Sequence, residues 1–196
     1  MKHLFPSIAV SLALALPCLG VSAAEVNGIK FDESMTVGGK SLVLNGLGVR
    51  HKLVKVYAVG LYLTDKKSTT EDILALTGPK RFRLVTMRDI TSEELAQAVL
   101  TGINKNLAKE EKTKFVSQLT KFGELFNEVE GGKKGDVIIG DYIPGTGTVI
   151  LFNGKPLGQP LPELGFYNAI LRIWIGNSPA DPTLKPLLLG EKPDAG

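Results

Sequence analysis

Hydrophobic residues are densest between positions 42 and 63, where two strand-like runs follow one another. The second run, residues 53–63, is apolar or aromatic at nearly every position, and strand alternation divides it between two faces. One face carries Val54, Val56, Ala58 and Tyr62, and the other carries Leu53, Tyr57, Val59, Leu61 and Leu63. A strand that is apolar on both faces must be covered on both. Residues 53–63 are therefore predicted to form the central strand of a layered fold.

The same periodicities predict elements on both sides of this strand. Alternation and turn residues predict further strands at 26–31, 35–37, 81–87, 137–143, 148–152 and 155–157. Helical spacing predicts helices after a capping box at residues 91–94, after the charged break 109–112, and over 163–175. The second helix carries the aromatic stripe Phe115, Phe122 and Phe126, which we interpret as core. The order of strands, helices, strands and helix predicts an α+β fold, an antiparallel sheet with helices packed on one side.

The first 24 residues have the pattern of a cleaved export signal. Lys2 precedes a mainly apolar run over residues 4–19, and small residues precede the expected cleavage site before Glu25. An uncleaved membrane anchor is the alternative, but the run is short for a membrane span and is interrupted by Pro6 and Pro17. The pattern predicts a periplasmic or secreted protein with no integral membrane span after cleavage.

Removing 24 of the 196 residues leaves 172, a length that favours one domain. We place that domain at residues 25–176. A proline-rich tail, residues 177–196, is predicted to run extended over the surface, with residues 187–189 as the part that can dock. The net charge of the whole chain is +3, and its basic residues are scattered. Nucleic acid is therefore not an expected partner.

The residues that carry most enzyme chemistry are scarce. The single cysteine, Cys18, lies in the predicted leader, and His51 is the only histidine after it. Thiolate nucleophiles, disulfides, and multi-histidine or cysteine-ligated metal sites are thus excluded from the mature chain. Nucleotide-binding glycine loops and the G-x-S-x-G and H-E-x-x-H signatures are missing from the sequence. We predict no catalytic residue, no metal and no cofactor.

Three segments carry a resemblance to a known family. The motif G-x-G-V-R at residues 46–50, followed by K-V-Y-A-V-G-L-Y-L at 55–63, is similar to the chalcone isomerase family, and in particular to its exported, bacterial chalcone isomerase-like branch. Residues 81–87 and the helix 167–176 fit the same family in the same order. The resemblance spans about residues 42–176 and implies a chalcone isomerase-type open-faced β-sandwich.

The resemblance also implies where a site would lie. The family's cleft arginine, which polarises the substrate, corresponds to Arg50, and its water-holding threonine corresponds to Tyr57. The cleft lysine corresponds to Arg88 or Asp89, depending on a one-residue gap. The family's tyrosine, asparagine and last-helix hydroxyl fall on Leu95, Gly102 and Ile173. The arginine is therefore kept, whereas most of the polar cluster that supports ring closure is apolar or small.

These observations favour a non-catalytic binding protein. We expect Arg50, Tyr57, Thr86 and Arg88 to form the polar end of a mostly apolar cleft that binds a small hydrophobic anion, a fatty acid or a phenolic. A chalcone isomerase-type intramolecular lyase is one alternative. Another is a scaffold role in which a protein partner binds the basic face of Arg81 and Arg83. Arg50 would then form a buried ion pair with Asp89 or Asp141.

Overall fold

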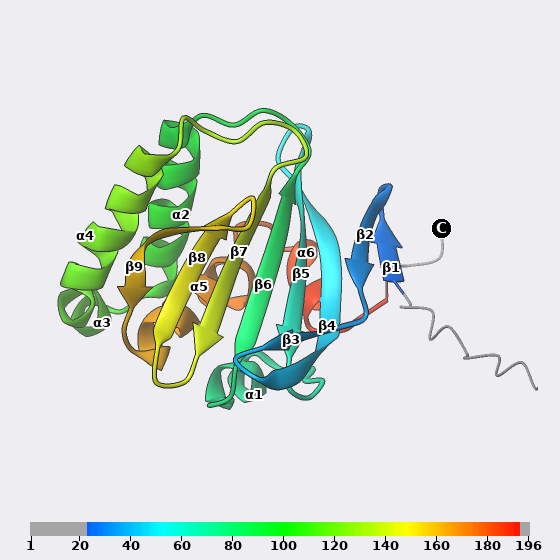
Figure 1. Ribbon diagram of the computed structural model, residues 1–196, viewed down its shortest axis with the longest axis horizontal. Coiled ribbons are helices and arrows are strands. Elements are labelled where there is room, and N and C mark those ends of the chain that lie inside the picture. The colour runs from blue at the N-terminus through cyan, green and yellow to red at the C-terminus, as the bar shows by residue number, and fades with distance from the viewer. Residues whose placement is uncertain (1–22, 193–196) are drawn as a thin grey trace, which may run out of the picture.

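Seven strands form one antiparallel sheet, and the helices cover one of its two faces (Figure 1). The computed structural model describes residues 23–192. The strands of the sheet lie side by side in chain order: β3 (Ser34–Val37), β4 (Lys40–His51), β5 (Lys55–Leu63), β6 (Lys80–Thr86), β7 (Val137–Ile143), β8 (Gly147–Phe152) and β9 (Lys155–Leu161). The strands β1 (Ala23–Val26) and β2 (Ile29–Asp32) form a separate hairpin beside β4. The predicted α+β fold, an open-faced antiparallel sheet with helices on one side, is confirmed.

The helices lie in the connections after β5, after β6 and after β9. They are α1 (Thr70–Ala75), α2 (Ser92–Asn106), α3 (Lys109–Lys114), α4 (Val116–Glu124), the 3₁₀ helix η1 (Leu125–Glu128), α5 (Leu164–Ile175) and α6 (Leu184–Leu188). α2 begins at the predicted capping box, where the Thr91 hydroxyl accepts a hydrogen bond from the Glu94 N–H at 3.1 Å. No helix within residues 23–192 has the length and apolarity needed to cross a bilayer. The predicted leader, residues 1–24, lies outside the described residues except for Ala23 and Ala24 in β1.

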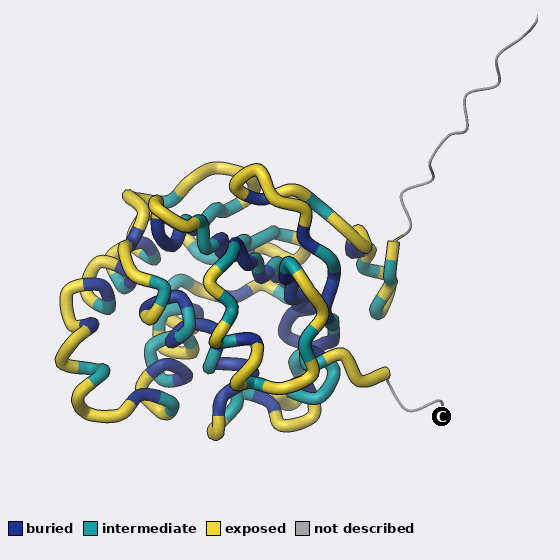
Figure 2. Tube along the Cα trace, turned by 90° about the horizontal axis from the view of Figure 1, so that it is seen from below, coloured by how far each residue is buried: buried dark blue, intermediate teal, exposed yellow. Residues whose placement is uncertain are grey.

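The central strand has the two apolar faces that the sequence predicts. Tyr57, Val59, Leu61 and Leu63 belong to the core cluster between sheet and helices, whereas Ala58 and Tyr62 belong to a second cluster on the opposite face. Eight of the nine residues of β5 are buried, and the tube in Figure 2 shows the buried segments running through the middle of the molecule. The prediction is wrong at its first two residues and at Val56, which belongs to the helix-side cluster and not to that of Ala58 and Tyr62. Leu53 and Val54 lie in the β4–β5 turn and are exposed, because the strand begins only at Lys55.

The aromatic stripe of the predicted second helix lies in the core. A break at Phe115 divides that helix into α3 and α4. The ring centres of Phe115 and Phe122 lie 6.0 and 5.7 Å from that of Phe166 on α5, in edge-on geometry. Such contacts stabilise beyond the burial of area alone. The interpretation of the stripe as core is confirmed.

The tail does not run extended over the surface as predicted. It turns into α6, whose residues Leu184 and Leu188 are buried, and α6 packs against β4. Gly46 and Gly48 permit this approach, because a Cβ added at Gly46 would lie 2.0 Å from the Leu187 carbonyl oxygen. Pro186 is tolerated because it occupies the first turn of the helix. The docking predicted for residues 187–189 is confirmed for Leu188.

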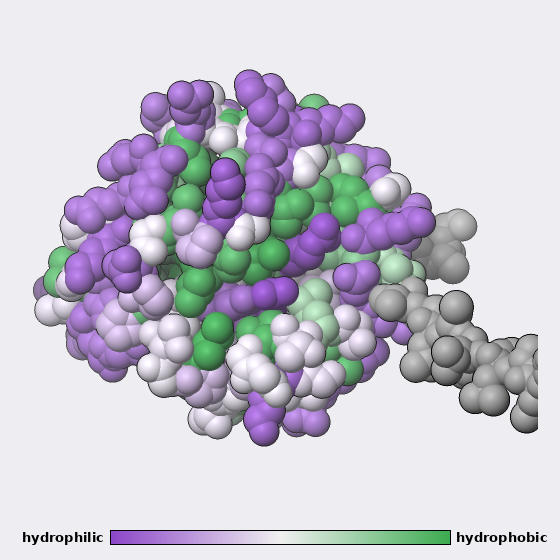
Figure 3. Space-filling view, viewed as in Figure 1, coloured by the Kyte–Doolittle hydropathy of each residue, from purple (hydrophilic) through white to green (hydrophobic). Residues whose placement is uncertain are grey.

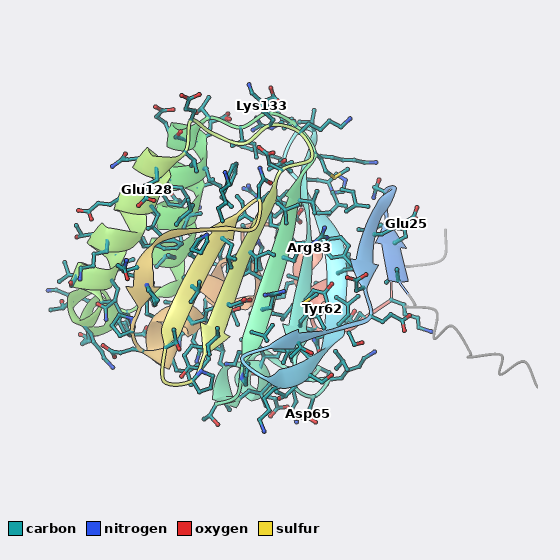
Figure 4. All side chains as sticks on the ribbon, viewed as in Figure 1. Glu25, Tyr62, Asp65, Arg83, Glu128 and Lys133 are labelled. Atoms are coloured by element: carbon teal, nitrogen blue, oxygen red, sulfur yellow. The ribbon has the colours of Figure 1, made fainter. Side chains whose placement is uncertain are left out.

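The face opposite the helices carries charged side chains between apolar ones (Figure 3). Arg81 forms two hydrogen bonds of 2.5 Å with the Asp141 carboxylate, and its side chain is only 19% exposed. Arg83 lies 4.8 Å from the Phe31 ring centre and donates to the Lys30 carbonyl, both in the β1–β2 hairpin (Figure 4). The prediction of a free basic surface at Arg81 and Arg83 is therefore wrong, because Arg81 forms an ion pair and the β1–β2 hairpin covers Arg83.

Candidate ligand-binding site

Arg50 lies at the end of β4, beside the strand that forms the centre of the fold. It pairs with Tyr57 across the β4–β5 ladder, and an irregularity in register follows between Arg50 and His51. The guanidinium carbon of Arg50 lies 5.6 Å from the centre of the Tyr57 ring, a distance typical of cation–π contact. Because paired residues of an antiparallel ladder share a face, both side chains lie on the helix side of the sheet.

Arg50 has no carboxylate partner among the described residues. None of the five ion pairs within residues 23–192 includes it, and its buried Nε has no hydrogen-bond acceptor. The alternative of an ion pair with Asp141 or Asp89 is wrong, because Asp141 binds Arg81 and Asp89 binds Lys133 at the surface. A buried N–H donor without an acceptor is costly. The group is therefore available to an anion from outside the chain.

Tyr57 provides a neutral phenol beside this cation. Its hydroxyl accepts a hydrogen bond of 2.7 Å from the indole N–H of Trp174 and keeps its own proton to donate. Burial raises the pKa of Tyr57, although the Arg50 guanidinium favours the phenolate and acts against the shift. The phenol therefore remains protonated at neutral pH. A cationic donor and a neutral O–H donor lie side by side.

Both residues line a cleft of about 440 Å³ between the end of the sheet, α2 and the residues after α5. This volume falls in the usual range for small-molecule sites. The charged groups of its lining are Arg50, Lys52, Arg88, Glu94 and Lys105. Four cations thus face one carboxylate, so the cleft favours an anion. It is more polar than the mostly apolar cleft that the sequence predicts.

Arg88 lies at the rim of this cleft and already has a carboxylate partner. Its guanidinium forms an ion pair with Glu94 at 3.1 Å, and its side chain is 37% exposed. The hydrogen bond from Arg88 lowers the pKa of the Glu94 carboxyl, and this keeps Glu94 ionised. Asp89 points elsewhere and accepts from the Lys134 N–H at 2.9 Å. Of the two candidates for the family's lysine position, Arg88 is the one in the cleft.

Thr86 does not belong to the cleft lining. It pairs with Tyr57 across the β5–β6 ladder, but its hydroxyl donates to the backbone carbonyls of Lys133 and Asp136. The loop before β7 covers it and leaves it 2% exposed. The prediction of Thr86 as a site residue is therefore not supported by its position. Three of the four predicted residues, Arg50, Tyr57 and Arg88, come together.

The prediction missed the wall formed by α2 and the segment that crosses it. Glu94, Gln97, Thr101 and Lys105 line the cleft at helical spacing, and Ser178, Pro179 and Ala180 close its far side. The i, i+3 and i+4 spacing of these polar residues was visible in the sequence. The contribution of residues 178–180 had no such signal.

Two positions of the family's polar cluster, 95 and 102, lie at the cleft, and the third, 173, lies in the apolar core behind it. Leu95 and Gly102 form part of the wall. A Cβ added at Gly102 would lie 2.9 Å from a methyl group of Ile173, so a larger residue there would require Ile173 to move. Ile173 itself is buried at 4% exposure. Gly102 and Ile173 are therefore packed directly against each other.

A second, smaller cavity lies behind the cleft. It has a free volume of about 50 Å³ and is lined only by apolar side chains, among them Phe82, Val99, Phe122 and Trp174. Leu95 borders both this cavity and the cleft, and is the one residue that they share. Within residues 23–192 no cluster of three or more histidine, cysteine, aspartate or glutamate side chains is arranged to hold a metal ion.

Comparison with known proteins agrees with this architecture. A solved structure of a fatty-acid binding protein from Arabidopsis thaliana superimposes with a TM-score of 0.67 at 18% sequence identity, covering 86% of this chain and 96% of that one. A search of curated protein sequences gave no match. The sequence profile described as chalcone isomerase-like matches residues 23–190, which include α6 and nearly all of the described chain. The chain therefore belongs to the chalcone isomerase-like family.

Proposed function

We propose that this protein binds a small hydrophobic anion, a fatty acid or a phenolic, without converting it. The observation that carries the proposal is Arg50, a partly buried cation with an unpaired Nε and no carboxylate partner among the described residues. An anionic oxygen next to it can also accept a hydrogen bond from the Tyr57 hydroxyl. A charged hydrogen bond of this kind is about twice as strong as a neutral one.

The apolar part of the ligand has a place behind Leu95. The small cavity there is enclosed by aromatic and aliphatic side chains and borders the cleft only through Leu95. A rotation of the Leu95 side chain about χ1 would join the two spaces. The ligand would then lie with its anionic end at Arg50 and the first carbon atoms of its body toward Phe122 and Trp174, since a free volume of about 50 Å³ accepts only a short segment until the lining side chains move. The similar fold of the Arabidopsis thaliana fatty-acid binding protein supports this ligand class.

The residues around Arg50 favour binding over catalysis. Ring closure of a chalcone requires an oriented oxyanion and a positioned donor in the transition state. Leu95 and Ile173 place hydrocarbon where the family resemblance puts the tyrosine and the hydroxyl, and Gly102 has no side chain where it puts the asparagine. The cleft can therefore hold an anion but provides few groups that would stabilise a change in its charge.

We also propose that the protein belongs to an exported, bacterial branch of the family and acts in the periplasm or outside the cell. Support comes from the leader pattern of residues 1–24. Cleavage before Glu25 would leave two residues, Glu25 and Val26, of the four in β1. N-terminal sequencing of the protein from its host tests this, because a chain that begins at Met1 would contradict export by cleavage.

Native mass spectrometry of the protein purified from its host tests the binding function. We expect an adduct that denaturing extraction identifies as a fatty acid or a phenolic. A protein without adduct that also fails to bind added fatty acids and chalcones would contradict the proposal. A chalcone absorbance assay completes the test, since turnover above the uncatalysed rate would show an enzyme instead.

A further inference from the structure

The turn between β4 and β5 exposes hydrophobic side chains at the mouth of the cleft. Leu53 is 97% exposed and Val54 is 59% exposed, while the Lys52 N–H donates to the Val54 carbonyl and closes the turn. The only other strongly exposed large apolar residue within residues 23–192 is Val116, at the start of α4. Turn tips are usually polar, because water solvates them. Two adjacent aliphatic residues at a tip indicate a contact with an apolar phase.

The tip is continuous with the proposed binding site. Lys52 lines the cleft directly, and Arg50 lies two residues before it on β4. The antiparallel pairing places the end of β6 and the start of β7 at the same end of the strands as this turn. Lys133 lies at this end of the strands in Figure 4, and Asp65 lies at the opposite end. Any surface that receives the tip therefore also faces the entrance of the cleft.

The charge around the tip favours an anionic surface. Residues 51–55 contain Lys52 and Lys55 and no carboxylate. Of the acids at this end of the strands, Glu94 binds Arg88 and Asp89 binds Lys133, whereas Asp181 and Asp136 accept only from uncharged donors. Asp181 is buried beneath the tip, so the exposed charges next to Leu53 are those of the lysines. Apolar side chains flanked by lysines combine burial in the acyl region with attraction to lipid phosphates.

We propose that the β4–β5 turn docks on an anionic lipid bilayer. Leu53 and Val54 enter the boundary between headgroups and acyl chains, and Lys52 binds phosphate groups. Lys55 joins it by exchanging its present acceptor, the Asn27 side-chain oxygen, for a phosphate oxygen. The contact is weak and reversible, because only two apolar side chains insert. It places the cleft entrance against the membrane, so that a hydrophobic anion passes between bilayer and Arg50 without crossing bulk water. The cargo in this inference rests on the proposed function, whereas the docking itself does not.

Tryptophan quenching measures the docking without any ligand. The chain has one tryptophan, the buried Trp174, so Leu53→Trp and Val116→Trp each add one exposed reporter to the same background. Vesicles of phosphatidylglycerol and brominated phosphatidylcholine should quench the reporter at 53 at least twofold more than the reporter at 116. Vesicles without phosphatidylglycerol should quench it less. Both variants are purified from the exporting host after processing, so that the apolar run at residues 4–19 does not itself insert into the vesicles.

Equal quenching of the two reporters, or none at position 53, would overturn the proposal, and a protein partner for the tip would be the alternative.

A second measurement follows the transfer of a fluorescent fatty acid from protein to vesicles. The double variant Leu53→Asp, Val54→Asp should slow transfer at least fivefold with equilibrium binding unchanged, while Val116→Asp should not. If no fatty acid binds, the proposed function fails but position-specific quenching still supports docking. If the fatty acid binds and the reporter at 53 is not quenched, docking alone fails.

Discussion

Lys80 gives the most quantitative prediction, because it is a cation buried without a counter-charge. It is the first residue of β6, is 0% exposed, and donates one hydrogen bond of 3.0 Å to the side-chain oxygen of Asn168 on α5. No ion pair of the described residues includes it. Burial lowers the pKa of Lys80 from its ordinary 10.5 to about 8. The fold therefore holds an ammonium group at a cost.

The size of this cost follows from the pKa. At about 1.4 kcal/mol per pKa unit, the difference between 10.5 and about 8 corresponds to roughly 3 kcal/mol of lost stability at pH 7. The substitution Lys80→Met keeps most of the volume and removes the charge. It also leaves the Asn168 oxygen without its donor, which costs about 1 kcal/mol at a half-buried site. We expect Lys80→Met to be more stable than the unchanged protein by about 2 kcal/mol at pH 7.

The pH dependence has a definite sign. Below pH 8 both the folded and unfolded states carry a protonated Lys80, so the full cost is present. Between pH 8 and 10.5 the unfolded state binds more protons, and the free energy of unfolding of the unchanged protein rises with pH. The advantage of Lys80→Met should therefore shrink across this window. Above it, the missing hydrogen bond should make the variant slightly less stable.

Urea unfolding at pH 7, 8.5 and 9.5 and constant ionic strength measures this difference. The exposed lysine Lys66 is the matched control, and Lys66→Met should change the free energy of unfolding by less than about 0.5 kcal/mol at each pH. A Lys80→Met variant that is less stable than the unchanged protein at pH 7, by an amount that does not vary with pH, would refute the reasoning. It would mean that Lys80 has a partner that compensates its burial.

Three further substitutions test contacts around the site. Arg50→Met should change the free energy of unfolding, measured in urea, by less than about 1 kcal/mol, since the Arg50 Nε has no partner to lose. A fall of roughly 3 kcal/mol would reveal an ion pair. Gly46→Ala should cost at least about 2 kcal/mol and speed proteolysis near α6, because its Cβ would overlap that helix, whereas Gly123→Ala in α4 should not destabilise. Asp141→Asn should cost about 3 kcal/mol by leaving Arg81 without its carboxylate, and an unchanged urea midpoint would contradict this.

Much of the fold was predictable because its main signal is local. The two apolar faces of β5 lie within one run of residues, and the capping box of α2 spans four. The predictions failed where distant parts of the chain decide the outcome. Leu53 and Val54 are as apolar as buried strand residues, and nothing nearby in sequence shows that the ladder ends before them. The helix α6 is buried because β4, about 140 residues earlier, provides glycines beneath it.

The residues of the site also separate into those that the sequence predicts and those that depend on distant parts of the chain. Arg50 and Tyr57 were named together because the family resemblance assigns both to the cleft, and the structure pairs them across the β4–β5 hairpin. Thr86 is the instructive error, since it pairs with Tyr57 across the β5–β6 ladder but the loop at 132–136 covers its hydroxyl. A strand pattern predicts the face of a side chain and not what covers that face. The contribution of residues 178–180 depends on how the chain returns after α5, which periodicity does not describe.

The most direct measurement of the central claim is the affinity of the protein for a long-chain fatty acid, by calorimetric titration, in Arg50→Met, Arg50→Lys and Arg83→Met. Arg83 is the matched control, because it lies on the opposite face of the sheet beside the β1–β2 hairpin. Loss of a charged hydrogen bond should raise Kd at least about tenfold in Arg50→Met. The increase should be smaller in Arg50→Lys, which keeps the charge but not the planar guanidinium group, and Arg83→Met should leave Kd unchanged. Equal affinity in all three variants would contradict the assignment of Arg50 as the anchor of the ligand.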